Sequence, residues 1–403
     1  MVFSNLIFLY LFLPVCLIFY FLCQNIRAKN AVLIVFSLIV LFHEFGHFLL
    51  AKRGGICVVE FSLGMGPRLF SFVKGGTRYS LKLLPFGGSC MMLGEDEGYD
   101  APGETEKGSS CDQNQSLTDG KTDRLLLPPG ATGTYFNAVS AWTRFKVVVA
   151  GPVFNFILAW FCAFFVISCV GFDPASVVSV EDGYPAQEAG LQVGDTIWSI
   201  DGHRIYFTTN VSEYLARGGD THDIVVKRDG EKVALNDFYL VAREYPGQDG
   251  KMYGFYFGTK PATFGAKLQT TWYSAMDFVR MAWMGLSDLF AGAVGVKDLS
   301  GPVGIVSMMN EVGKESATKA AAFSNIAYFS AFIAVNLAVM NMLPLPALDG
   351  GRVFCLLVTW VLERISRRKI DPKYEGYIHT AGLVLLLALM AYVMYNDISK
   401  LVT

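Results

Sequence analysis

The chain has 403 residues, of which 53% are hydrophobic and 17% are charged, and its formal net charge is −2. A soluble domain carries about 25% charged residues, and here the apolar residues gather in runs of roughly 20, the length that spans a bilayer core. This composition excludes a single soluble globule, a collagen-like or coiled-coil chain and a wholly disordered chain. The small net charge gives no support to nucleic-acid binding.

Five segments are long and apolar enough to be predicted as membrane spans. Lysine and arginine gather in the loop after the second segment and in the loop between the last two, so both loops are predicted to be cytoplasmic and residues 171–320 to lie outside. The five segments are residues 6–23, 31–50, 147–170, 321–343 and 377–398.

Three regions between the spans have a different character. Residues 95–124 are acidic and rich in Gly and Ser, which is typical of a disordered cytoplasmic insertion. Residues 173–262 contain short alternating runs bounded by the turn pairs Asp201-Gly202 and Asp229-Gly230, which predicts a small β-rich domain. Residues 269–296 combine charged residues with tryptophans at helical spacing, which favours an amphipathic helix at the membrane interface over a span.

The strongest chemical signal is the segment His43-Glu44-Phe45-Gly46-His47, which lies inside an apolar run. Histidines at positions i and i+4 share one face of a helix and can both bind one zinc ion. Glu44 is placed to take a proton from water at that metal, as in the H-E-x-x-H arrangement of metalloproteases. Polar groups in a membrane helix are costly, which favours a functional role for them over a chance match.

Zinc in a catalytic site needs a third protein ligand. Asp349 is the better candidate, because it follows Pro344 and Pro346 at the cytoplasmic end of a predicted span, where broken backbone indicates a buried or wet site. Two alternatives stay open. His379 could be the ligand instead, or Asp349 could cap a turn where the chain leaves the membrane.

These motifs resemble those of the site-2 protease family of intramembrane zinc metalloproteases. The resemblance rests on the H-E-F-G-H segment and on the later pattern from Asn341 to Asp349-Gly350. Further segments that resemble this family are Glu60–Pro67, Leu84–Gly88, Gly151–Asn155, Tyr184–Asp195 and Leu299–Gly304. The Tyr184–Asp195 segment resembles a PDZ domain of the kind inserted in bacterial members of the family.

The resemblance implies an α-helical polytopic membrane protein with a membrane-associated β segment and an inserted β-rich PDZ domain. Residues 1–30 are an extra N-terminal membrane segment that the resemblance does not reach. The expected parts after it are the catalytic helix and β segment (31–94), the disordered insertion (95–124), the second core helix (125–172), the extracytoplasmic PDZ domain (173–262), the amphipathic interfacial region (263–320) and the C-terminal core helices with the third zinc ligand (321–403).

Three residues are candidates for substrate binding. Gly87 and Gly88 would let an unwound substrate backbone approach the β segment and add to it as a strand, and the alternative is a plain turn. The Asn341 amide could hold the substrate backbone, and the alternative is a bond within its own loop. The PDZ domain could capture a freshly trimmed end or exclude bulky outer domains, or its 185–195 loop could be a structural turn.

The predicted function is zinc-dependent cleavage of peptide bonds within or near transmembrane segments, after a first cleavage by another protease. The resemblance implies regulated intramembrane proteolysis, with single-span membrane proteins of the anti-sigma factor or remnant signal peptide class as substrates. The chain is expected to be a multi-pass protein in the bilayer of the cell membrane, with the active site near the cytoplasmic side. The alternative is a catalytically silent scaffold that binds peptides through its PDZ domain.

Overall fold

The computed structural model describes residues 26–95, 127–170, 175–217, 221–238, 243–244, 251–258, 263–292, 319–366 and 373–402. The predicted segment 6–23, nearly all of the insertion 95–124 and the Leu299–Gly304 segment lie outside these ranges. The chain divides into two compact units. The first unit combines Met1–Cys162 with Phe278–Thr403, and the second is Ala163–Asp277.

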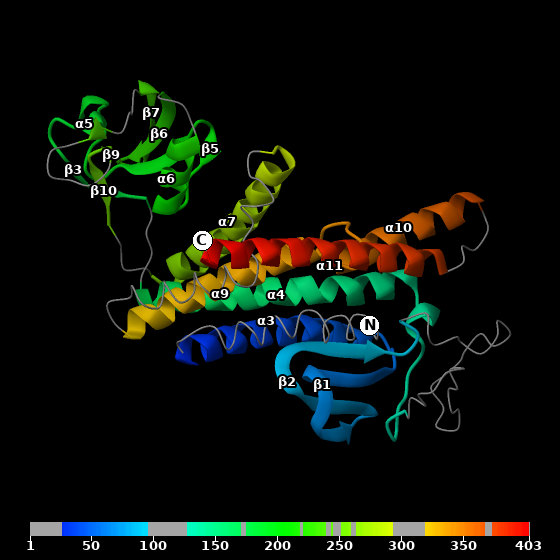
Figure 1. Ribbon diagram of the computed structural model, residues 1–403. Coiled ribbons are helices and arrows are strands. Elements are labelled where there is room, and N and C mark those ends of the chain that lie inside the picture. Colours follow the sequence, from blue (N-terminus) through cyan, green and yellow to red (C-terminus); the bar gives the residue numbers. More distant parts are fainter. Residues whose placement is uncertain are drawn as a thin grey trace. The chain divides into compact units, whose positions relative to one another are not determined.

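Long helices form most of the first unit. Figure 1 shows α3 (Ile26–Arg53), α4 (Ala141–Val170) and α9 (Lys319–Asn341) side by side. Their apolar faces meet around the buried residues Ile39 of α3, Leu158 of α4 and Val335 of α9. Phe278, from α7 (Phe264–Phe290), joins this cluster. A buried helix–helix core of this kind orders the part of α3 that carries the histidine pair.

Three described helices are long and apolar enough to cross a membrane. They are Ala141–Cys169, Phe323–Asn341 and Gly376–Val393, and the last lies in α11 (Lys373–Val402). These helices cover most of the predicted spans 147–170, 321–343 and 377–398. The predicted span 31–50 lies within α3.

One helix of this unit was missed by the sequence prediction. Residues Asp349–Ser366 form α10, in a segment that the prolines and glycines had suggested was irregular. The irregular part is only the stretch from Met342 to Leu348, and α10 begins at Asp349. An acidic residue in the first turn favours a helix start, because it complements the positive end of the helix dipole.

Two long antiparallel strands, β1 (Val58–Lys74) and β2 (Thr77–Met92), pack against α3. Both strands bend, so that the first part of β1 pairs with two parts of β2. Phe61 lies opposite both Cys90 and Tyr79. The C-terminal part of β2 is thereby one outer strand of the folded ribbon, beside the histidine helix.

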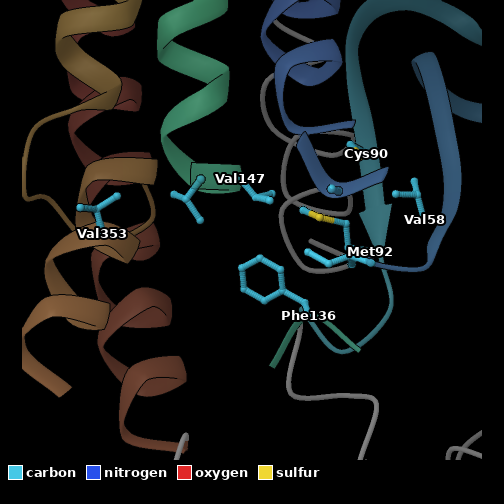
Figure 2. Close-up of a cluster of buried hydrophobic side chains, with 9 residues drawn as sticks. Val58, Cys90, Met92, Phe136, Val147 and Val353 are labelled. Carbon is cyan, nitrogen blue, oxygen red and sulfur yellow. The ribbon is translucent and has the colours of Figure 1, made fainter. Parts of the chain in front are cut away.

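A second cluster of buried side chains joins α3, the two strands, α4 and α10. It contains Val58 of β1, Cys90 and Met92 of β2, Val147 of α4 and Val353 of α10 (Figure 2). Ala51 of α3 belongs to it as well. Ala51 lies one turn after His47, and Val353 lies one turn after Asp349. The same apolar cluster therefore fixes the two chain segments that carry the candidate ligands.

The second unit is rich in antiparallel strands. Its four-stranded sheet has the order β5 (His203–Arg204), β4 (Thr196–Ile200), β6 (His222–Arg228), β7 (Glu231–Phe238). Two smaller pairs join β3 (Val177–Val180) to β10 (Phe255–Phe257), and β8 (Arg243–Glu244) to β9 (Lys251–Met252). Between its strands lie two short helices, α5 (Pro185–Glu188) and α6 (Thr208–Arg217). The unit also includes the end of α4 and the first half of α7.

Both predicted Asp-Gly pairs form hairpin turns in this unit. Asp201 and Gly202 have φ values of 48° and 78°, and Asp229 and Gly230 have φ values of 49° and 92°. Two successive residues with positive φ are the signature of the type I′ turn, which suits the twist of an antiparallel hairpin.

Candidate metal centre

Side chains from α3 and α10 meet at one point. His43 Nε2 lies 3.2 Å from His47 Nε2 and 3.1 Å from an Oδ2 atom of Asp349. His47 Nε2 lies 3.5 Å from the same oxygen. All three residues are largely buried, with exposed side-chain fractions of 12%, 8% and 19%. Two segments that are far apart in the sequence thus supply one group of three metal-binding side chains.

The distances fit a zinc ion. Zinc binds nitrogen and oxygen at about 2.0–2.1 Å in a tetrahedron, which sets neighbouring ligand atoms about 3.3 Å apart. The three distances, 3.1, 3.2 and 3.5 Å, bracket that value. Asp349 Oδ2 is buried and has no hydrogen-bond partner of good geometry among the described residues. An oxygen in that state suits a metal ligand, because a buried carboxylate oxygen needs a positive partner.

Helix α4 supports the histidine pair from the side. His47 donates a hydrogen bond from Nδ1 to the Val147 carbonyl at 2.8 Å. A donor at Nδ1 leaves the Nε2 lone pair available for a metal. Gly151 lies one turn further along α4, where a Cβ atom would be 2.6 Å from His47 Cε1 and 2.7 Å from His43 Cε1. Only glycine leaves room for both rings at this position.

Glu44 is held beside the histidines by the β ribbon. Its side chain is 8% exposed, and one carboxylate oxygen accepts a hydrogen bond of 2.9 Å from the backbone N–H of Cys90. A Cβ atom at Gly88 would lie 3.4 Å from Glu44 Cγ. The glutamate therefore occupies a fixed position between α3 and the outer strand of the ribbon.

The loop before Asp349 is fixed by α11. The backbone N–H of Ala347, which has a φ of 72°, donates a hydrogen bond of 3.0 Å to His379 Nδ1. Arg352, one turn into α10, forms an ion pair with Glu95, just beyond the end of β2. His379 thus contacts the loop before Asp349, and Asp349 is the residue that reaches the histidine pair.

The structure distinguishes between the residues singled out in the sequence. His43, His47 and Asp349 converge, and Glu44 follows His43 in the chain. Gly88 packs against Glu44, Gly87 has a φ of 73°, and Asn341 is the last residue of α9. The substrate-binding roles of Gly87, Gly88 and Asn341 stay predictions.

Sequence reasoning missed the supporting residues Val147, Gly151 and Cys90. Val147 and Cys90 act through backbone atoms, which do not depend on the residue type, so the sequence carries no signal for their roles. Gly151 was quoted only as part of a family motif, and no pattern within α4 shows that it faces the histidine rings.

A buried His-His-Asp group with an adjacent glutamate is the kind of centre that metallopeptidases use to cut amide bonds. Comparison with known proteins agrees with this class. The model of peptidase family M50 matches residues 31–389, so the chain belongs to this family, the site-2 proteases. It is a zinc metalloprotease and a membrane protein.

Several relatives match over almost their whole length. A Clostridium perfringens protein is 32% identical over 368 residues, which cover 91% of this chain and 97% of that protein. The regulator of sigma-W protease RasP of Bacillus subtilis is 30% identical, with 92% and 98% covered. The zinc metalloprotease RasP of Geobacillus kaustophilus is also 30% identical, with 94% and 99% covered.

Proposed function

We propose that His43, His47 and Asp349 hold the zinc ion and that Glu44 is the general base. The observation that carries this assignment is the tetrahedral spacing of the three ligand atoms, 3.1, 3.2 and 3.5 Å apart. When bound, zinc supplies a Lewis acid that acidifies water and polarises a peptide carbonyl. Glu44 takes the proton of the attacking water and later delivers a proton to the leaving amine.

The hydrogen bond from Cys90 gives Glu44 a defined direction. It occupies one carboxylate oxygen and leaves the second free to accept a proton. The donor is a strand N–H that points away from β1 and toward α3. Because the carboxylate is already oriented, little rotational freedom is lost when the reaction takes place.

The substrate is proposed to be a peptide segment within or near a transmembrane helix. A helix resists hydrolysis because its amides are hydrogen-bonded internally, so the segment must first unwind. The C-terminal part of β2 offers an outer strand next to Glu44, to which an extended segment could add as a further strand. Gly87 and Gly88 lie at the start of this strand part and are proposed to let a second backbone approach it, and the Asn341 amide is proposed to bind the same segment.

The second unit is proposed to be a PDZ domain over residues 173–262. Support comes from its antiparallel strands, its short helices α5 and α6, and the ion pair of the buried Asp195 with Arg228. This pair ties the 185–195 loop to β6 with contacts of 2.7 and 2.8 Å. We place this domain outside the membrane, where it receives a substrate end left by an earlier cleavage. Comparing substrates with a free and an amidated C-terminus tests whether the domain captures a terminal carboxylate. Comparing substrates with and without a bulky outer domain tests whether it excludes substrates by size.

The proposed setting is regulated intramembrane proteolysis in the cell membrane, with several spans and the active site near the cytoplasmic face. The name of the Bacillus subtilis relative, a regulator of sigma-W protease, supports anti-sigma factors as one substrate class. Remnant signal peptides are the other class, since both are single-span segments. The proposed division of the remaining chain is the one given above, with 31–94, 125–172 and 321–403 forming the catalytic core.

The test is comparative membrane proteomics of cells with the wild-type protein and with Glu44→Gln. Truncated single-span fragments are expected to accumulate only in the variant. If the variant cells process every such fragment as the wild type does, the proteolytic proposal is wrong and the PDZ-bearing scaffold becomes the better account. Zinc content of the two purified proteins is measured in parallel and is expected to be equal.

A further inference from the structure

The two ring nitrogens of His43 face different partners. Nε2 faces His47 and Asp349, while Nδ1 lies 3.3 Å from the side-chain amide of Asn155 on α4. Asn155 is completely buried. A buried amide at this distance from a ligand ring has a defined role, because every hydrogen bond it makes is made within the protein.

The proton on His43 decides which end of the amide must face the ring. A neutral imidazole that gives its Nε2 lone pair to a metal carries its hydrogen on Nδ1. Nδ1 is then a donor and needs an acceptor. An amide NH₂ group cannot accept a hydrogen bond, whereas the amide oxygen can.

The amide oxygen of Asn155 is available for this contact. With the nitrogen toward His43, the oxygen is buried and has no hydrogen-bond partner among the described residues. The oxygen and nitrogen of an amide are assigned from the surrounding hydrogen bonds, so the two can be exchanged. Either assignment leaves one end of the amide without a described partner, and the tautomer of His43 therefore determines the choice.

We infer that Asn155 is a positioning residue, whose amide oxygen accepts a hydrogen bond from His43 Nδ1 and holds that ring ready for zinc. This inference rests on the proposed ligand role of His43. With this bond, each of the two histidines donates one hydrogen bond from Nδ1 to α4. His47 donates to the Val147 carbonyl and His43 donates to Asn155, both on α4, with Gly151 between them.

The spacing of these three residues along α4 explains why all three reach the histidine rings. Val147, Gly151 and Asn155 follow one another at intervals of one turn and lie on one helix face. A helical side chain leans toward the N-terminus of its helix, so the Asn155 amide reaches back toward Gly151 and the rings. Groups that orient a metal-binding histidine in this way typically contribute 10- to 100-fold to metal affinity.

The test uses the purified full-length protein and two substitutions of similar size. Asn155→Leu removes the acceptor, and Asn155→Asp retains an acceptor oxygen. We expect the leucine variant to bind zinc about 10- to 100-fold more weakly in competition with a chelating dye. The aspartate variant is expected to bind at least as tightly as the wild type. The visible spectrum of bound Co²⁺ is expected to change in the leucine variant and to resemble the wild type in the aspartate variant.

The aspartate variant keeps the inference testable if the leucine variant does not fold. If Asn155→Asp bound zinc about 10-fold or more weakly than the wild type, a hydrogen-bond acceptor at this position would not be what holds the His43 ring, and the inference would be overturned. Unchanged zinc affinity in Asn155→Leu would overturn it as well. Asn336→Leu, at a half-buried asparagine of α9 for which no contact with the three candidate ligands is found among the described residues, is the control and is expected to bind zinc normally. If His43→Ala bound zinc like the wild type, the ligand assignment itself would fail.

Discussion

Glu44 and Cys90 are joined by a 2.9 Å hydrogen bond, which runs from a strand N–H to a buried carboxylate. The contact connects the proposed general base on α3 with the strand to which a substrate is proposed to add. Movement of the outer strand would therefore move the Glu44 carboxylate as well.

Replacing Glu44 by glutamine separates zinc binding from cleavage. The glutamine oxygen can still accept the hydrogen bond from Cys90, but the amide cannot take a proton from water. We expect normal zinc content and a loss of cleavage of at least about 10²- to 10⁴-fold, the usual contribution of a general base. Cleavage of a purified single-span substrate in detergent measures this. Residual activity near the wild-type level would show that Glu44 is not the base.

Asp349 is expected to be necessary for zinc retention. Asp349→Ala removes one of three ligands and leaves a cavity beside the histidines, so zinc should be lost faster to a chelator, together with activity. Zinc content per purified chain before and after dialysis against the chelator is the measurement. A variant that holds zinc as tightly as the wild type and still cleaves would refute the assignment.

His379 is expected to be dispensable as a ligand. His379→Gln can still accept a hydrogen bond near Ala347, and Asp349 stays in place, so one zinc per chain should be retained. His379→Leu is expected to retain zinc but to exchange it faster, because the loop before Asp349 loses its contact with α11. Loss of zinc from the glutamine variant would favour the alternative in which His379 is the third ligand.

Gly151 is expected to tolerate no side chain. In Gly151→Ala the new methyl group would lie 2.6 Å from His47 Cε1, so the ring must move. Overpacking of this kind costs about 1–3 kcal/mol, and here it also distorts the ligand geometry. Zinc affinity and thermal unfolding are the measurements. Gly285→Ala on α7 is the matched control, because nothing lies within 4 Å of a Cβ atom there, and normal zinc affinity is expected.

Glu60 gives the β ribbon a pH-dependent stability. Burial alone would raise the pKa of this carboxyl, but the hydrogen bonds from Arg68 and the nearby charges of Lys82 and Arg68 lower it below its usual value. A pKa that is lower in the folded state stabilises the protein above the unfolded-state pKa, and this stability is lost as pH falls through the folded-state pKa. We expect Glu60→Gln to lower the unfolding temperature at neutral pH and to differ less from the wild type below about pH 4. A difference that does not change with pH would contradict this interpretation.

Sequence patterns predicted the local features well. The Asp-Gly pairs at 201–202 and 229–230 form turns because the backbone angles required there suit few residue types. The i, i+4 spacing of His43 and His47 places both rings on one helix face in any sequence context. Asp349 was identified because prolines before it broke an apolar helix.

The supporting contacts could not be read in the same way. The carbonyl of Val147 and the N–H of Cys90 are present in nearly every residue, so only the packing of α4 and β2 against α3 shows their roles. The start of α10 carried a local signal, since Asp349 is an acidic residue at a helix N-terminus. The glycines that follow it concealed this signal.

The distance in sequence between the histidine pair and Asp349 has a consequence for synthesis. A growing chain presents His43 and His47 early, but it lacks the carboxylate until α10 has been made. With the proposed ligand set, an unfinished chain would contain only two of the three ligands and would be unable to hydrolyse neighbouring proteins while it is being inserted. Hydrolytic capacity would then arise only when nearly the whole polypeptide has left the ribosome.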